Sequence, residues 1–121
     1  MAARILLVDD DRLVLAILSE GLKGLGYEVV TASSGEQALA ITEHVVHDLV
    51  ILDIRMPGMS GIETARHLRK RGSIPFIFLS AFGEEVVRLV ADEGALGYLV
   101  KPIDIPQMIP TIEAALAGNR R

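Results

Sequence analysis

Cysteine and tryptophan are absent from this chain of 121 residues, and its aromatic residues are two tyrosines and three phenylalanines. Without cysteine the sequence offers no disulfide, no thiolate nucleophile and no thiolate ligand for a metal. Basic residues are also few, because 12 lysines and arginines stand against 16 aspartates and glutamates and leave a net charge of −4. This balance argues against nucleic-acid binding by the domain itself, since no basic excess would neutralise phosphates.

Long apolar runs are missing as well. No segment approaches the roughly 20 apolar residues that a membrane span needs, and no apolar run follows a basic start at the N-terminus. We therefore expect a cytoplasmic protein with no membrane partner. Half of the residues are apolar and 23% are charged, which is typical of a globular domain. Without repeats or an internal linker, residues 1–121 are expected to form one domain.

Short apolar or β-branched runs alternate along the chain with segments whose apolar residues recur at helical spacing. Strands are predicted at 4–9, 28–32, 48–53, 75–80 and 97–100. Helices are predicted at 11–25, from 34 to about 45, from 60 to about 71, at 84–93 and from 104 to about 117. Two capping boxes, Ser34 with Gln37 and Ser60 with Glu63, mark the starts of the second and third helices.

Five strands alternating with five helices predict an α/β fold, in which helices cover both faces of a parallel sheet through right-handed crossovers. The runs 4–9, 48–53 and 75–80 are the most continuously apolar and should be the central strands. The runs 28–32 and 97–100 suit the edges. The resulting strand order, 2-1-3-4-5, is that of the flavodoxin-like doubly wound fold.

Polar side chains stand at the ends of four predicted strands. Asp9 and Asp10 stand at the end of the first strand, Asp53 ends the third, Ser80 ends the fourth, and Lys101 follows the fifth. In an open parallel sheet the carboxyl ends of the strands lie at one edge, where ligands bind. We therefore expect these five side chains to form one site.

Carboxylates gathered at one edge favour a cation. Two unit negative charges about 4 Å apart repel by roughly 4 kcal/mol at an effective dielectric constant near 20. Carboxylates without histidine or cysteine favour Mg²⁺, which keeps several waters and often binds a phosphate as well. A carboxylate nucleophile beside magnesium, a hydroxyl and an ammonium indicates phosphoryl transfer through an aspartyl-phosphate.

Four motifs, each at the end of a predicted strand, resemble the response regulator receiver family of two-component signalling. They are Asp9-Asp10, the segment 53–61 (Asp-Ile-Arg-Met-Pro-Gly-Met-Ser-Gly), Leu79-Ser80-Ala81 and Lys101-Pro102. The resemblance covers residues 4–117. It implies a phosphorylation-activated signalling domain that controls an output such as transcription. Such a domain is no enzyme in the usual sense, because it catalyses only its own phosphorylation and dephosphorylation.

The resemblance also implies the acceptor and the metal ligands. Asp53 would accept a phosphoryl group from a sensor histidine kinase. Asp10 and Asp53 would bind Mg²⁺ directly, Asp9 would support the ion through water, and Arg55 would supply its backbone carbonyl.

The remaining implied roles concern the response to phosphorylation. Ser80 would donate its hydroxyl to the phosphoryl group and Lys101 would pair with it, with a cis bond between Lys101 and Pro102. Tyr98 matches an aromatic switch position and would turn inward as Ser80 moves. The face made by the fourth helix, the fifth strand and the fifth helix would then change, and we hypothesise homodimerisation through it.

Two other classes of protein stay open. A Mg²⁺-dependent phosphohydrolase would usually carry a second acid two residues after the nucleophile, where this chain has Arg55, and would need a substrate cap. A phosphorylation-independent adaptor with this fold would be expected to have lost part of the acidic site, which is complete here.

Several residues have simpler interpretations. Asp11 is interpreted as a helix N-cap. Tyr98 could merely fill an edge strand. His44, His47 and His67 lie on or beside predicted helices without ligand partners and are expected at the surface.

The segment 97–116 is similar to receivers that carry an antiterminator-type (ANTAR) RNA-binding output domain, which would follow Arg121. A stand-alone receiver is the alternative. If Asp104 caps the last helix, Pro110 falls at about its sixth position, where it lacks a hydrogen bond and clashes with the preceding turn. We therefore expect the helix either to kink there or to begin its regular part only near Gln107.

Overall fold

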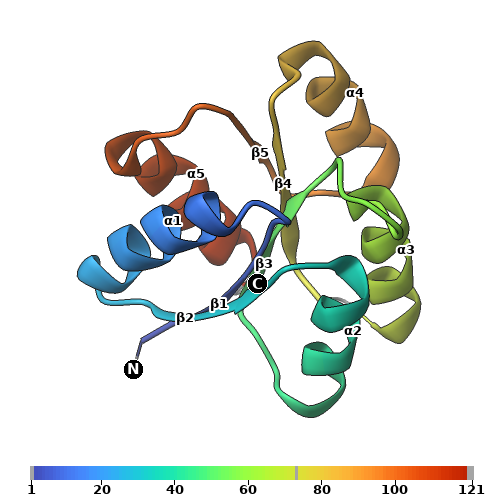
Figure 1. Cartoon of the computed structure of the whole chain (residues 1–121), viewed down its shortest axis with the longest axis horizontal. Helices are drawn as coiled ribbons and strands as arrows, with labels where there is room; N and C mark the ends of the chain where they lie inside the picture. The colour runs from blue at the N-terminus through green and yellow to red at the C-terminus, as the bar shows by residue number, and fades with distance from the viewer. Residues whose placement is uncertain (1, 73, 120–121) are drawn as a thin grey trace.

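Five parallel strands form a single sheet in this computed structural model, which describes residues 2–72 and 74–119 (Figure 1). The strands are β1 (Arg4–Val8), β2 (Glu28–Ala32), β3 (Leu49–Asp53), β4 (Phe76–Ser80) and β5 (Tyr98–Val100). Their order is β2-β1-β3-β4-β5, so the predicted topology is confirmed. The most apolar runs do become the central strands.

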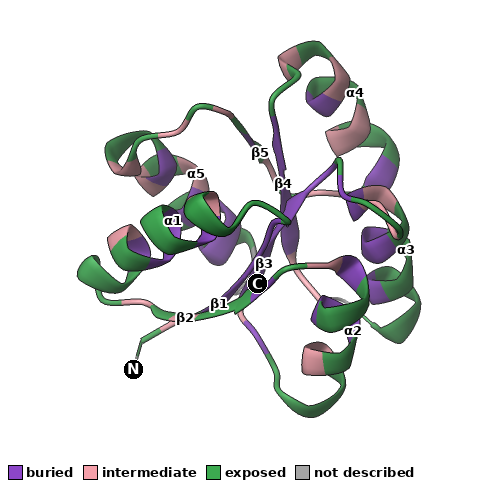
Figure 2. Ribbon diagram, viewed as in Figure 1, coloured by how far each residue is buried: buried purple, intermediate pink, exposed green. Residues whose placement is uncertain are grey.

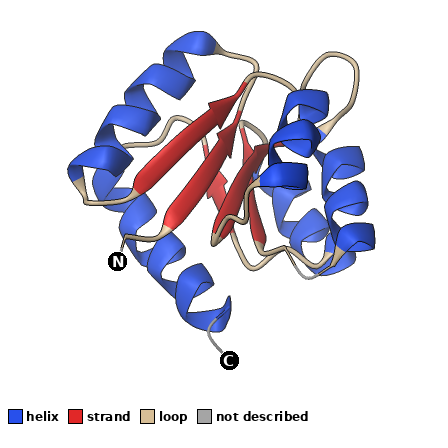
Figure 3. Ribbon diagram, turned by 90° about the horizontal axis from the view of Figure 1, so that it is seen from below, coloured by secondary structure: helices blue, strands red, loops and turns tan. Residues whose placement is uncertain are grey.

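Five helices connect the strands and cover both faces of the sheet. They are α1 (Arg12–Gly24), α2 (Gly35–His44), α3 (Gly61–Arg71), α4 (Gly83–Glu93) and α5 (Ile105–Asn119). The pair α1 and α5 packs on one face, while α2, α3 and α4 pack on the other (Figures 1 and 3). Within the described residues, no helix has both the length and the apolar character needed to cross a membrane.

Side chains that alternate along the central strands feed two separate cores. In β1, Ile5 and Leu7 point toward α1 and α5, whereas Leu6 and Val8 point toward the other three helices. Every residue of β3 and β4 is buried, as the purple strands of Figure 2 show. Burial on both faces explains why these strands read as unbroken apolar runs rather than as alternating patterns.

Side chains cap several helices as the sequence predicts. Asp11 is the N-cap of α1, because its Oδ1 accepts hydrogen bonds from the amides of Leu13 and Val14 at 2.9 and 3.3 Å. Ser34 and Ser60 each accept from the amide three residues later. The second hydrogen bond of the predicted Ser34–Gln37 capping box differs from the expected one. The Gln37 side chain accepts from the amide of Ser33 rather than from that of Ser34.

Helix α5 remains helical at Pro110, which lies inside it. Asp104 accepts a hydrogen bond from the amide of Gln107 at 3.1 Å, which confirms it as a cap. The helix already begins at Ile105 and includes Pro110, so of the two expected alternatives the later start near Gln107 is wrong, and the kink at Pro110 stays a prediction.

One histidine is not where the sequence analysis placed it. His44 and His67 are exposed as expected, but His47 is only 5% exposed. Its Nδ1 lies 3.2 Å from the carbonyl oxygen of Val45, and its Nε2 is buried without a hydrogen-bond partner among the described residues. Burial lowers the pKa of His47 below its ordinary value. The error arose because only the His47 side chain is buried here, while the preceding Val45 and Val46 remain exposed.

Candidate functional site

Asp9 lies directly beyond β1 and is fully buried. Its amide donates to the carbonyl oxygen of Ala32 at 3.1 Å, which extends the β1–β2 pairing by one residue. Its carboxylate oxygen Oδ1 accepts the amide of Asp11 at 2.9 Å. The chain therefore turns into α1 around the Asp9 side chain and holds that carboxylate in place.

Asp53 ends the central strand β3 and is 4% exposed. The loop after it returns at once, because the amide of Gly61 donates to the carbonyl oxygen of Ile54 at 2.9 Å. A Cβ atom at Gly61 would overlap the backbone carbonyl of Asp53, so this close return requires glycine. The loop after β3 and the start of α3 thus hold the backbone at Asp53 and Ile54 in place.

Three carboxylates meet at this edge of the sheet, as predicted. Asp9, Asp10 and Asp53 each offer an oxygen, and these atoms lie within 4.8 Å of one another. Asp10 is exposed, while the other two are buried. An all-oxygen set with one member open to solvent fits a hard divalent cation that keeps part of its water.

The surroundings of Asp53 change the pKa of its carboxyl group. Burial, followed by the charge of Asp9, raises the pKa of Asp53 to about 7, although the nearby Lys101 ammonium works in the opposite direction. The site is therefore short of positive charge when no cation is bound.

Lys101 supplies the fixed positive charge. Its Nζ lies 2.9 Å from Asp9 Oδ2 and 3.5 Å from Asp53 Oδ1. Its amide donates to the carbonyl oxygen of Ser80 at 2.8 Å, and the bond to Pro102 is cis, as expected. Burial acts to lower the pKa of Lys101, but hydrogen bonding to Asp9 and the charges of Asp53 and Asp9 outweigh it, so the pKa is raised.

Ser80 ends β4 and is 1% exposed. Its Oγ accepts the amide of Phe82 at 2.9 Å and can donate to the carbonyl oxygen of the same residue at 3.4 Å. Phe82 is the N-cap residue of α4. The hydroxyl therefore connects the end of β4 to the start of α4.

Arg55 and Tyr98 are the two remaining residues of the predicted site. The Arg55 guanidinium stacks over the Phe82 ring at 4.5 Å, and its Nη2 lies 2.8 Å from Glu85 Oε2. Tyr98 is 40% exposed, so its ring lies at the surface of the sheet edge. Sequence reasoning missed Glu85, whose only signal is its place in the acidic first turn of α4.

The sequence model of a protein family, the response regulator receiver domain, matches residues 5–113. Such domains are the phosphorylation-controlled part of two-component signalling proteins. The chain belongs to this family.

Relatives and solved structures agree with this assignment. Transcriptional regulatory protein PdtaR of Mycobacterium tuberculosis is 38% identical over 119 residues, which cover 97% of this chain and 58% of that protein. Transcriptional regulatory protein CpxR of Klebsiella pneumoniae is 43% identical over 114 residues, covering 93% of this chain and 49% of that one. The chain thus spans about half the length of the curated relatives it matches.

Two solved structures share the fold closely. The chemotaxis protein CheY4 of Vibrio cholerae superposes with a TM-score of 0.89 at 31% identity, covering 95% of this chain and 99% of that one. Response regulator TrrA of Thermotoga maritima, solved in complex with Mg(2+)-BeF, gives a TM-score of 0.85 at 37% identity with the same coverage.

Proposed function

We propose that this domain is a signalling switch that accepts a phosphoryl group on Asp53 from a sensor histidine kinase in the presence of Mg²⁺. One observation carries the proposal: Asp53 ends the central strand within 4.8 Å of two further carboxylates and 3.5 Å from the Lys101 ammonium. A buried nucleophile between a cation site and a fixed ammonium is what phosphoryl transfer requires.

Phosphoryl transfer to Asp53 forms one bond and breaks one bond. A carboxylate oxygen of Asp53 attacks the phosphorus of a phosphohistidine, an O–P bond forms, the N–P bond breaks, and the leaving imidazole keeps the electron pair and takes up a proton. Lys101 offsets negative charge that builds on the phosphoryl oxygens. Mg²⁺, when bound, would supply the rest of that neutralisation.

The residues suited to hold Mg²⁺ are those of the carboxylate cluster. Asp10 and Asp53 would be direct ligands, Asp9 would act through water, and the backbone carbonyl of Arg55 would complete the set. The all-oxygen chemistry of the cluster supports this choice, as does the Mg(2+)-BeF complex of the related TrrA.

Phosphorylation would then change the hydrogen bonding of the Ser80 hydroxyl. To donate to the phosphoryl group, its hydroxyl must give up the carbonyl oxygen of Phe82 at the start of α4. Tyr98, now 40% exposed, would turn inward and change the face formed by α4, β5 and α5. This is a population shift, limited by how much better the phosphoryl group binds one state than the other.

The partners follow from this switch. A histidine kinase would be the phosphoryl donor, and the changed face would contact an output domain or a second copy of the chain. Exposed Val87, Leu96 and Val100 make that face apolar. The matched relatives are named transcriptional regulators, which supports an output in transcription control. An RNA-binding output of the antiterminator type stays a prediction from segment 97–116.

Incubation with a small phosphodonor and Mg²⁺, followed by intact-mass measurement over time, tests the proposal. The switch should gain the mass of one phosphoryl group and lose it slowly. Continuous turnover of the donor without a lasting mass gain would favour a phosphohydrolase instead. No mass gain and no turnover would favour an adaptor that works without phosphorylation.

A further inference from the structure

Helix α4 buries few of its side chains completely. Of its residues Gly83–Glu93, only Val86 and Glu93 are buried. Its N-cap residue, Phe82, provides no side-chain hydrogen bond to the helix. Leu89 and Val90 are partly buried against the same core as Val86, and polar contacts at the two ends of α4 add further restraints.

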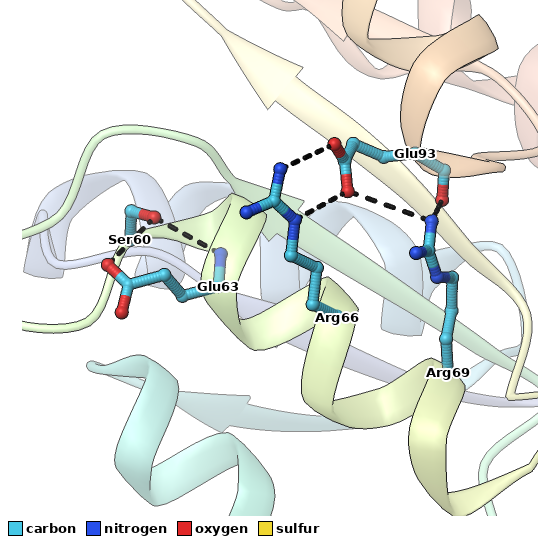
Figure 4. A network of polar contacts seen from close by, with 5 residues as sticks. All are labelled: Ser60, Glu63, Arg66, Arg69 and Glu93. Carbon is cyan, nitrogen blue, oxygen red and sulfur yellow. Dashed lines mark hydrogen bonds and ion pairs between the residues drawn. The ribbon is translucent and has the colours of Figure 1, made fainter.

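The C-terminal end is held by a buried carboxylate. The Glu93 side chain is 8% exposed and receives two hydrogen bonds of 3.0 Å from Arg66, in a paired arrangement, Nε to Oε1 and Nη2 to Oε2. Arg69 donates to the backbone carbonyl of Glu93 and lies 3.6 Å from Oε1 (Figure 4). Hydrogen bonding to Arg66 is the main cause of the lowered pKa of Glu93. This clasp joins α4 firmly to α3, because bidentate guanidinium–carboxylate pairs are geometrically fixed.

The N-terminal end is held more loosely. Arg55 makes a single hydrogen bond of 2.8 Å to Glu85, and its side chain is 62% exposed. The second oxygen of Glu85, Oε1, is buried without a hydrogen-bond partner among the described residues. Exposed single ion pairs contribute little and are easily replaced.

The N-terminal end of α4, which is held more loosely, is also the end beside Asp53 and Ser80. Arg55 is two residues after Asp53, and Phe82, on which its guanidinium stacks, is two residues after Ser80. A phosphoryl group would carry a charge of roughly −1.5 to −2, against −1 for the Glu85 carboxylate, and a guanidinium binds phosphoryl oxygens well.

We propose that Arg55 is a phosphoryl-responsive latch on α4, an inference that rests on the function proposed above. In the unphosphorylated protein Arg55 holds Glu85. A phosphoryl group on Asp53 draws the guanidinium away, just as it draws the Ser80 hydroxyl away from Phe82. The first turn of α4 then loses two restraints, while the Arg66–Glu93–Arg69 clasp keeps its contacts. Helix α4 consequently pivots about its C-terminal end.

Amide hydrogen exchange on the intact chain measures this asymmetry directly. Mg²⁺ with beryllofluoride serves as the phosphoryl mimic. In the wild type, the mimic should speed exchange in the first turn of α4 and leave the last turn unchanged. Glu85→Gln should show the faster first-turn exchange before the mimic is added. Glu84→Gln removes the same charge from an exposed neighbour and should behave like the wild type.

Binding of the mimic supplies a readout that a purely structural role of Glu85 would not move. Because coupling is reciprocal, a variant with a free Arg55 should bind Mg²⁺–beryllofluoride about two- to five-fold more tightly than the wild type. Glu84→Gln should leave the affinity unchanged. Glu93→Gln, in contrast, should let the mimic speed exchange along all of α4, whereas Asp92→Asn should not.

The outcomes separate the two proposals. If the mimic changes exchange around Asp53 but Glu85→Gln matches the wild type in exchange and affinity, the latch is overturned and the switch stands. If the last turn opens as much as the first in the wild type, the pivot is overturned. If the mimic changes exchange nowhere, the proposed function fails, and the latch fails with it.

Discussion

Replacing Asp53 by asparagine should stabilise the metal-free protein, and the gain should grow as the pH rises. The pKa of Asp53 is raised from 3.8 to about 7, chiefly by burial and by the charge of Asp9. Between these values the folded protein keeps a proton that the unfolded chain has already released. Raising the pH through this window therefore lowers the free energy of unfolding. Below pH 3.8 the effect is absent, and above about pH 7 it is complete.

The size of the effect follows from the same interval. A pKa that moves from 3.8 to about 7 corresponds, at about 1.4 kcal/mol per pH unit, to a cost of about 4 kcal/mol above neutral pH. Asparagine leaves the Lys101–Asp9 ion pair in place but loses the attraction between Lys101 and residue 53. We therefore expect a gain of roughly 2–4 kcal/mol above neutral pH, or on the order of 10 °C in Tm, and little gain near pH 4.

Urea denaturation in the presence of a chelator, repeated between about pH 5 and about pH 8, measures both the sign and the slope. The control is Asp92→Asn, which removes an exposed carboxylate near the end of α4 and should keep the wild-type pH profile. Stability curves of wild type and Asp53→Asn that run parallel over this range would refute the reasoning, even if one lay above the other.

Three further predictions concern the cation, the surface and the buried histidine. Mg²⁺ should raise the Tm, because a ligand of the folded state alone stabilises it, and Asp10→Ala should abolish the rise; equal responses in the two proteins would count against the metal site. Beryllofluoride should promote dimerisation through the face of α4, β5 and α5, so a monomer at high concentration with and without the mimic in sedimentation would remove that hypothesis. His47, whose pKa is lowered by burial, should make the protein less stable as the pH falls below about 6.5, since the unfolded chain takes up a proton there first. His47→Asn should reduce this loss of stability at acid pH, measured by denaturation at a series of pH values. An unchanged loss would mean that other groups cause the acid sensitivity.

Local patterns in the sequence were enough to predict the strands and the polar side chains that meet at their ends. The strand Leu49–Asp53 is buried on both faces, so it is apolar up to the single acid that ends it, Asp53. The four polar strand ends lie together because parallel strands share one carboxyl edge. The cis bond before Pro102 came from the resemblance rather than from any local pattern.

Contacts between distant charged residues could not be predicted in this way. Arg55 and Glu85 are 30 residues apart, and Arg66 and Glu93 are 27 apart, so no helical or strand period connects them. The packing of α3 against α4 brings Arg66 to Glu93, and the position of the loop after β3 beside the first turn of α4 brings Arg55 to Glu85. His47 was misplaced for a similar reason, because no local pattern distinguishes its buried side chain from the exposed Val46 beside it.

Locating the phosphoryl group tests the central claim most directly. The chain is incubated with Mg²⁺ and a small phosphodonor, and borohydride then reduces the acyl phosphate to homoserine, which peptide mass spectrometry can place. The predicted result is homoserine at residue 53 in the wild type and no labelling of Asp53→Asn. Labelling of another residue, or undiminished labelling of the variant, would contradict the assignment of Asp53 as the acceptor.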